Sequence, residues 1–311
     1  MIKAIVSNYQ GKNLSMNETI FERLERKKIL LLDCAMGTML QRSGLKSGEE
    51  CGEQWNVGPN REKVLAIHLA NVAAGSDIII TNTFGGNPLK LAHYGLAEKT
   101  RELNRAGVKL ACQAAGDNVF VAGDIGPTGE ILEEWGGTRS KDEISDAYSS
   151  QVEGLLEGGV DLFALETFMD VEELKIALAA IKKACSLPIL ASMTFGATPG
   201  GIRTMWGLTP EEVGRELENS GAEIAGANCG MGTREMLQVI AQMSRGTSLP
   251  LAAQPNAGKP QVHNGVTVFP ETAEEMAQAA PEFKAAGASL LGGCCGTTPE
   301  YIAQVKKKLG L

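Results

Sequence analysis

The sequence of 311 residues lacks the features that mark several large classes of protein. No apolar run reaches the roughly 18 to 20 residues of a membrane span, and the polar stretch at residues 1–17 is unlike a secretory signal. A net charge of −8 without a basic stripe argues against nucleic-acid binding. We therefore expect a cytoplasmic protein that contacts neither a membrane nor nucleic acid.

Several catalytic and cofactor-binding patterns are also missing. The chain has no P-loop, no well-placed G-x-G-x-x-G and no serine–histidine–acid arrangement. The three histidines, His68, His93 and His263, stand in predicted helices or loops away from the strand ends, so we interpret them as surface or capping residues. Seven cysteines without a secretory signal argue against a disulfide framework and leave free, metal-bound or catalytic thiols as the alternatives.

A pattern of small residues followed by a short apolar run recurs along the chain, as at residues 74–80 and 158–165. It is typical of a helix that ends at glycine and turns into a buried strand. The runs are continuous rather than alternating, as expected for parallel strands covered on both faces. The pattern predicts eight strands separated by helix-sized segments, at residues 29–32, 78–80, 119–122, 162–165, 188–193, 224–227, 251–253 and 290–291.

Eight β/α units in a chain of this length predict an α/β fold, a single-domain (β/α)8 TIM barrel over residues 16–311. A doubly wound open sheet is the alternative fold. Residues 1–15 show little periodicity and are predicted to be an N-terminal extension, with Met16 as an alternative start to Met1.

Acidic and sulfur-containing residues follow the predicted strands directly. Asp33 comes after the first strand, Glu166 after the fourth, Cys229 after the sixth, and Cys294 with Cys295 after the eighth. In a barrel the carboxyl ends of the strands meet at one rim, where active sites are built. We therefore expect these side chains to share a site. The alternative, that loops are simply polar and glycine-rich, does not explain acids and cysteines directly after buried strands.

Three thiols on one rim suit a metal. Three thiolates match the ligand preferences of Zn²⁺ and leave its fourth position open, as in catalytic sites. Glycines beside Cys294 and Cys295 would let the backbone bend so that both sulfurs reach one ion. A vicinal disulfide or two buried structural thiols are the alternatives. A zinc site of this kind favours a thiol substrate, which it converts to a nucleophilic thiolate.

The chain resembles the homocysteine S-methyltransferase family, which includes betaine–homocysteine methyltransferase and the homocysteine domain of cobalamin-dependent methionine synthase. The resemblance runs from about residue 29 to the C-terminus. It rests on seven ordered blocks: Leu32-Asp33-Cys34-Ala35-Met36-Gly37-Thr38, Thr81-Asn82-Thr83-Phe84, Gly123-Asp124-Ile125-Gly126-Pro127-Thr128-Gly129, Glu166-Thr167-Phe168, Asn228-Cys229, Pro255-Asn256-Ala257-Gly258 and Gly292-Gly293-Cys294-Cys295-Gly296-Thr297.

The resemblance implies an enzyme that methylates homocysteine to methionine at one zinc ion per chain. Cys229, Cys294 and Cys295 would bind the metal, and the sulfur of homocysteine would complete the tetrahedron. Asp33 and Glu166 would hold the amino group, because buried acids need a cation nearby; helix capping is the alternative role for both.

Four further residues are drawn into the predicted site. Backbone N–H groups after Asp33, at Cys34 and Ala35, would suit the substrate carboxylate, and Asn82 is expected to contact substrate. Asn256 would occupy the fourth zinc position in the absence of homocysteine, unless it is only a loop asparagine in a turn.

Two departures from the family pattern stand out. Cys34 replaces the usual glycine, which would alter how the substrate approaches and would add a thiol near the zinc. Gly230-Met231-Gly232 replaces a serine-containing loop, so the hydrogen bonds to the Cys229 sulfur are expected to differ.

The sequence leaves the methyl donor open. Several blocks resemble the methionine synthases, and because the chain ends at Leu311 we expect a separate methyl-corrinoid protein, or methylcobalamin, to supply the methyl group. Direct transfer from betaine, S-methylmethionine or another sulfonium is the alternative. Betaine would need an aromatic cage, for which Trp55, Trp135 and Trp206 are the candidates. A non-catalytic zinc- or thiol-binding barrel is the remaining alternative.

Overall fold

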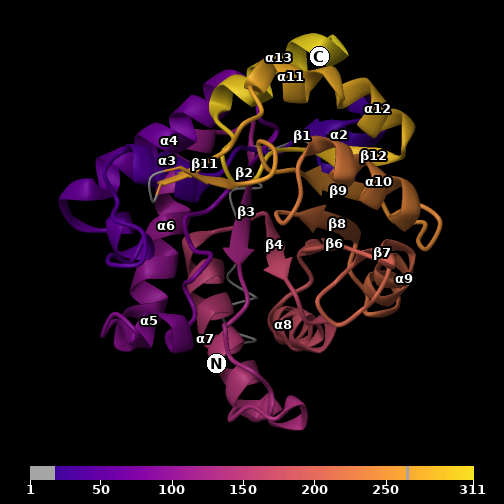
Figure 1. Ribbon diagram of the computed structural model, residues 1–311. Helices are drawn as coiled ribbons and strands as arrows, with labels where there is room; N and C mark the ends of the chain where they lie inside the picture. The colour runs from indigo at the N-terminus through magenta and orange to yellow at the C-terminus, as the bar shows by residue number, and fades with distance from the viewer. Residues whose placement is uncertain (1–17, 264–265) are drawn as a thin grey trace.

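A barrel of eight parallel strands forms the centre of the molecule (Figure 1). The computed structural model describes residues 18–263 and 266–311, so the predicted extension at residues 1–15 and the choice between Met1 and Met16 lie outside the described residues. Each predicted strand is present. The strands are β1 (Leu30–Leu31), β2 (Ile78–Ile80), β3 (Phe120–Ile125), β4 (Leu162–Phe168), β5 (Ile189–Met193), β8 (Ile224–Asn228), β9 (Leu251–Gln254) and β12 (Ala288–Leu291).

The strand order shows that the sheet is a barrel and not an open sheet. Neighbours follow the chain in the order β1-β12-β9-β8-β5-β4-β3-β2, and the first strand pairs with the last. An open doubly wound sheet would instead reverse its order at a switch point. At the seam between β1 and β2, the Asp77 N–H donates to the Leu31 carbonyl at 2.7 Å and the Asp77 carboxylate accepts from the Leu31 N–H at 3.0 Å. The TIM-barrel prediction is therefore confirmed.

Helices surround the strands and bury one apolar face each against them (Figure 1). Some begin at side-chain caps, such as the capping boxes at Ser140 and Thr209, and several end at a left-handed glycine such as Gly159. The outer layer comprises α4 (Arg61–Ala74), α6 (Thr100–Ala115), α7 (Lys141–Gly158), α8 (Val171–Ala184), α9 (Pro210–Asn219), α10 (Thr233–Met243), α11 (Ala273–Gln278), α12 (Ala280–Ala285) and α13 (Pro299–Leu309).

Shorter elements lie in the loops that follow the strands. Helix α3 (Met36–Arg42) comes after β1, and α5 (Pro88–Ala92) comes after β2. Two hairpins, β6 (Gly196–Thr198) with β7 (Gly201–Arg203) and β10 (Gln261–His263) with β11 (Val266–Val268), follow β5 and β9. These insertions build up the rim at the carboxyl ends of the strands.

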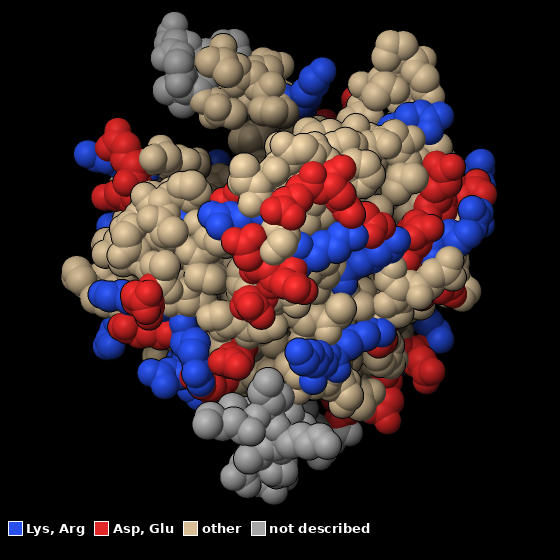
Figure 2. All heavy atoms as spheres, turned by 90° about the horizontal axis from the view of Figure 1, so that it is seen from below, with Lys and Arg blue, Asp and Glu red and all other residues tan. Residues whose placement is uncertain are grey.

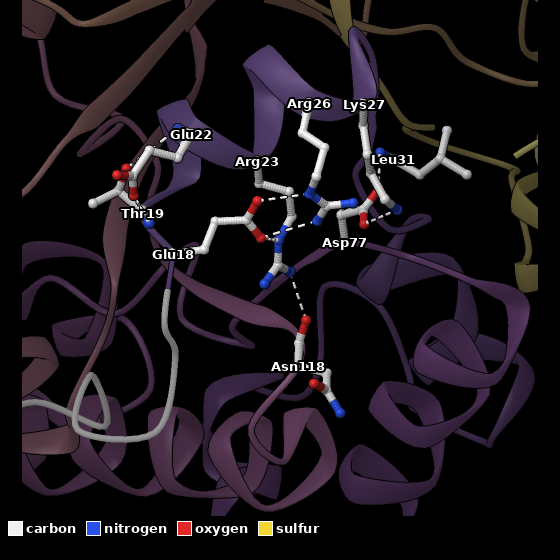
Figure 3. A network of polar contacts seen from close by, with 9 residues as sticks. All are labelled: Glu18, Thr19, Glu22, Arg23, Arg26, Lys27, Leu31, Asp77 and Asn118. Carbon is white, nitrogen blue, oxygen red and sulfur yellow. Dashed lines mark hydrogen bonds and ion pairs between the residues drawn. The ribbon is translucent and has the colours of Figure 1, made fainter.

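The opposite end of the barrel is closed by α2 (Ile20–Lys27). Ile20, Phe21 and Leu24 pack against the apolar side chains inside the barrel. Two contacts attach the helix to the barrel (Figure 3): Lys27 Nζ lies 2.6 Å from Asp77, and Arg23 donates to the Asn118 carbonyl at 2.6 Å. Glu18 pairs with Arg23 and Arg26 at the helix itself. Because this end is plugged, a ligand can enter only from the carboxyl ends of the strands.

The charged surface is mixed. Figure 2 shows Lys and Arg side chains interspersed with Asp and Glu over the described part of one face. In the part of the chain that the structure describes, no helix combines the length and the apolar character needed to cross a membrane.

Candidate active site

A pocket of about 490 Å³ opens at the carboxyl ends of the strands. Residues at or just beyond the carboxyl ends of β1, β2, β3, β4, β8, β9 and β12 line it, as expected for the rim of a barrel. The lining includes eight of the nine site residues predicted from the sequence: Asp33, Cys34, Ala35, Asn82, Glu166, Cys229, Cys294 and Cys295. The ninth, Asn256, is not part of it. The barrel therefore brings together residues that are up to 262 positions apart, such as Ala35 and Thr297, whose hydroxyl accepts from the Ala35 N–H.

Three sulfur atoms form the centre of the pocket. The Sγ atoms of Cys229, Cys294 and Cys295 all lie within 4.8 Å of one another, and those of Cys229 and Cys295 are 3.6 Å apart. None of the seven cysteines forms a disulfide, so the alternative of a vicinal disulfide is not realised in this structure. A cluster of three thiols at this spacing could hold one soft metal ion.

Glycines allow the adjacent cysteines to be placed side by side. A Cβ at Gly292 would lie 2.6 Å from the Leu32 Cβ, and one at Gly293 would lie 2.4 Å from the Thr297 hydroxyl oxygen. The Gly293 N–H donates to the Asp33 carbonyl at 3.0 Å, which joins the sulfur loop to the end of β1. Only glycine permits this close approach of the two chain segments.

The three clustered thiols shift one another's pKa. Hydrogen bonds from the thiols of Cys294 and Cys295 lower the pKa of Cys229 to about 3. The same contact with Cys229 raises the pKa of Cys294 and Cys295, in the latter case to about 12. A bound cation would favour ionisation of all three thiols.

Three carboxyl groups, those of Asp33, Asp124 and Glu166, also line the pocket. Asp33 is 3% exposed and accepts from the Ile80 N–H at 2.8 Å, while Glu166 accepts from the Gln254 amide at 2.6 Å. Burial raises the pKa of Glu166 to about 7, although the Gln254 hydrogen bond works in the opposite direction. Burial also raises the pKa of Asp33 and Asp124, and the charge of Glu166 adds to both effects. Such acids favour a cationic partner.

Neither Asp33 nor Glu166 caps a helix, so the capping alternative is wrong. The residue before α3 is Ala35, which makes no side-chain cap, and the cap of α8 is Asp170. The two carboxyl groups accept hydrogen bonds from Ile80 and Gln254 instead.

Asp124 and Gln254 are site residues that the sequence reasoning left without a role. Asp124 lies near the carboxyl end of β3 and lines the pocket. Its Oδ1 is buried and has no hydrogen-bond partner in the described structure. Its position after a buried strand, like that of Asp33, was the available signal. Gln254 also directly follows a predicted strand, at residues 251–253, but its hydrogen bond to Glu166 joins residues 88 positions apart and could not be predicted from the sequence.

Cys34 and Ala35 lie in the pocket wall, but their N–H groups already have acceptors. Cys34 donates to the Asn71 side chain and Ala35 to the Thr297 hydroxyl, each at 3.2 Å. The Cys34 side chain belongs to the apolar core between strands and helices, and burial raises its thiol pKa. It is not a member of the sulfur cluster, so the expectation of an added thiol near the metal is not met.

Asn82 and Asn256 are both buried. The Asn82 amide donates to the Gly52 carbonyl at 2.8 Å and to the Asn56 side chain at 2.9 Å, which ties the loop after β2 to the pocket wall. Asn256 is hydrogen-bonded to the Cys229 sulfur, an interaction that contributes to the low pKa of Cys229. Its Oδ1 is buried and has no partner in the described structure.

The tryptophans do not form a cage around the pocket. Trp55 is buried elsewhere, with Lys63 Nζ 4.6 Å from the centre of its ring. Trp135 and Trp206 form a half-exposed pair with ring centres 5.1 Å apart. No tryptophan is among the described residues that line the pocket.

The histidine predictions are partly wrong. His93 is exposed and directly follows α5, in agreement with the prediction, but His68 is completely buried in α4. His263 lies in β10.

Comparisons with known proteins identify the family of the chain. Residues 30–309 match the homocysteine S-methyltransferase family, and the chain belongs to that family. It is 32% identical to the methionine synthase of Mycobacterium leprae over 98% of this chain, and 34% identical to that of Mycobacterium tuberculosis over 90% of it. These alignments cover 26% and 24% of the two relatives, so the chain spans about a quarter of their length.

Solved structures of the homocysteine methyltransferase MmuM from Escherichia coli have the same architecture. The oxidised form has a TM-score of 0.75 and 26% identity, with 94% of this chain and 100% of that chain covered. The metallated form has a TM-score of 0.73 and 25% identity, with 92% and 98% covered. The likeness therefore extends over nearly the whole of both chains.

Proposed function

We propose that the chain transfers a methyl group to the sulfur of homocysteine, which yields methionine, with the help of a zinc ion held by Cys229, Cys294 and Cys295. The observation that carries this proposal is that three thiols and three carboxyl groups, two of them on buried residues, line one pocket. The thiols suit a metal that binds a substrate sulfur, and the carboxyl groups suit the ammonium of an amino acid. Membership of the homocysteine S-methyltransferase family supports the same conclusion.

The residues present fit zinc. Their sulfur atoms lie within 4.8 Å of one another and form a soft donor set that leaves one position for a further ligand. The unpartnered Oδ1 of Asn256 lies on a side chain that contacts Cys229, so we propose Asn256 as the additional ligand when no substrate is bound. When bound, zinc lowers the pKa of a coordinated thiol, so that homocysteine can react as a thiolate near neutral pH.

The carboxyl groups would bind and orient the substrate. An ammonium group among Asp33, Asp124 and Glu166 supplies the positive charge that their burial requires. Gln254 fixes the direction of the Glu166 carboxylate through the hydrogen bond of 2.6 Å. Held at its amino group, homocysteine directs its sulfur toward the cysteines. Contact of the substrate with Cys34, Ala35 and Asn82 stays a prediction.

In the transfer, the methyl carbon exchanges its bond to the donor for a bond to sulfur. The thiol of homocysteine loses its proton, a sulfur lone pair forms the new bond to the methyl carbon, and the bond between that carbon and the donor breaks. The electron pair of the broken bond stays with the donor. Because the pocket has one open end, the donor must approach from the rim.

A methyl-corrinoid, either free methylcobalamin or a partner protein that carries it, is the donor we favour. The similarity to two methionine synthases supports this choice. A sulfonium such as S-methylmethionine is the second candidate, because the described pocket lining contains five carboxyl groups and no Lys, Arg or His. Those groups belong to Asp33, Glu50, Glu53, Asp124 and Glu166. Betaine would gain from the same carboxyl groups, but the aromatic residues in the described lining are only Phe84 and Tyr94, without a tryptophan for a cage, so betaine is the weaker candidate.

A donor panel tests this proposal. Zinc-loaded protein is given homocysteine with methylcobalamin, S-methylmethionine or betaine, and methionine is measured. We expect zinc at one ion per chain, proton release when homocysteine binds, and methionine from methylcobalamin. Methionine from S-methylmethionine alone would select the sulfonium alternative. Homocysteine binding without turnover by any donor would favour the non-catalytic barrel.

Substitution of a cysteine tests the metal site separately. Cys294→Ala and Cys295→Ala are expected to lose both zinc and turnover, because two thiols no longer suffice for a tight site. Cys112→Ala is a matched control, since Cys112 lies on α6 and is outside the sulfur cluster. An active, zinc-free Cys294→Ala variant would contradict the assignment.

A further inference from the structure

Two residues of the active site have an unusual backbone conformation. Among the residues that the structure describes, three other than glycine have a positive φ: Lys28, Thr167 and Cys229. Lys28 only ends helix α2. Thr167, with φ of 61°, follows Glu166, and Cys229, with φ of 60°, is one of the clustered cysteines. A β-branched residue is rarely found in this region, and such strain persists only where surrounding contacts hold it.

One buried side chain lies between these two residues. Asn228 is completely buried, ends β8 and directly precedes Cys229. Its Oδ1 accepts from the Thr167 N–H at 2.7 Å, and its Nδ2 donates to the Thr167 hydroxyl at 2.8 Å. The same Nδ2 lies 3.9 Å from the Cys294 sulfur and donates to it. A single amide thus contacts Thr167 and Cys294.

These contacts cross strands that are not neighbours. In the barrel, β5 lies between β4 and β8, and β9 lies between β8 and β12. The hydrogen bonds of the sheet therefore do not join the end of β4, which carries Glu166, directly to the ends of β8 and β12, which carry the cysteines. The Asn228 side chain makes that connection.

We propose that Asn228 is a positioning residue that holds the carboxylate side of the pocket in register with the sulfur cluster. The inference rests on the proposed function, because the ammonium and the sulfur of one homocysteine molecule are a fixed number of bonds apart. Both can be bound at once only if Glu166 and the cysteines keep a matching separation. Asn228 fixes Glu166 through Thr167, and it fixes the cysteines through its own peptide link to Cys229 and its contact with Cys294.

The amide is required for this role. An aspartate at position 228 could still accept from the Thr167 N–H, but it could not donate to the Cys294 sulfur and would bring a negative charge to the thiolates. A serine at position 167 keeps the hydroxyl that accepts from Asn228, whereas a valine keeps the shape and loses that hydroxyl.

The test compares Asn228→Ala and Asn228→Asp with the wild type. Zinc affinity is measured by competition with a chelator, and homocysteine affinity by titration of the zinc-loaded protein. We expect zinc affinity to fall by about 10- to 100-fold, as for other residues that orient metal ligands. We also expect the loss of affinity for homocysteine to exceed the loss for 4-mercaptobutyrate, which has the thiol and lacks the amino group. Only a register between the two sides of the pocket predicts that difference.

Asn104→Ala is the matched control. Asn104 is also completely buried and donates to the Gly86 and Thr100 carbonyls, each at 2.7 Å, but it does not line the pocket. We expect it to lower stability without changing zinc or homocysteine affinity. The pair Thr167→Ser and Thr167→Val supplies a second measurement if the Asn228 variants do not fold, with the serine variant close to wild type and the valine variant impaired.

Equal losses for homocysteine and 4-mercaptobutyrate, or unchanged zinc and homocysteine affinities, would overturn the role of Asn228. Equal effects of Asn104→Ala and Asn228→Ala on ligand affinity would also overturn it. Failure of the wild-type protein to bind zinc or homocysteine would instead overturn the proposed function, so the two failures are distinguishable.

Discussion

His68 gives the protein a specific sensitivity to acid. Its side chain on α4 is completely buried, and in the described structure neither ring nitrogen has a hydrogen-bond partner. Burial lowers the pKa of this histidine from 6.5 to about 4. The folded protein therefore holds His68 neutral at pH values where the unfolded chain has already protonated it.

The sign and size of the effect follow from these two values. Because the pKa is lower in the folded state, stability is complete above about pH 6.5 and is lost as the pH falls toward 4. One pH unit corresponds to about 1.4 kcal/mol. Between pH 7.5 and pH 4.5, His68 alone should lower the free energy of unfolding by about 2.5 kcal/mol.

Denaturant unfolding at the two pH values measures this contribution. His68→Leu removes the titrating ring, so its loss of stability between pH 7.5 and pH 4.5 should be about 2.5 kcal/mol smaller than that of the wild type. Carboxyl groups contribute to the acid loss of both proteins and cancel in the comparison. His93→Gln is the control, because His93 is exposed. Equal acid losses in the wild type and His68→Leu would refute the reasoning.

Three further predictions concern other buried polar contacts. Asp77→Asn should lower the free energy of unfolding by about 1–3 kcal/mol in denaturant titrations, because the charged acceptor at the barrel seam is lost; an unchanged midpoint would contradict this. Tyr148→Phe should cost a similar amount, since its hydroxyl donates to the buried Glu173 carboxylate at 2.8 Å, and thermal unfolding would show no shift if that bond were unimportant. Gln254→Leu should raise the pKa of Glu166 above about 7, because the hydrogen bond that lowers it is lost. Homocysteine binding should then weaken at neutral pH and recover at higher pH, and a pH profile like that of the wild type would contradict this.

The strands were predictable because their signals are local. Parallel strands buried on both faces require continuous apolar runs, and glycine at the preceding helix end marks where each run begins, as at Gly75 and Gly159. Such features can be read from a few adjacent residues. The eight predicted strands are accordingly all present, with differences of only a few residues at their ends.

The surroundings of individual side chains were less predictable. His68 and Trp55 appeared to be surface or rim residues, yet both are buried, because helix α4 and the 3-10 turn at Glu53–Asn56 pack beneath neighbouring segments. The Cys34 thiol appeared to lie near the metal site but points into the core. Burial of a side chain depends on which distant segment covers it, and no local pattern reports that.

By itself, the sequence determined the β/α alternation and the placement of acids and cysteines after strands, because each depends on the order of residues within one β/α unit; the choice of a barrel over an open sheet needed the strand order. Only the tertiary structure decided how those residues meet. It placed three sulfurs within 4.8 Å of one another, gave Glu166 its Gln254 partner and set Asn228 between Thr167 and Cys294. These contacts join residues 61 to 88 positions apart, and their distances are set by closure of the barrel and the packing of its rim.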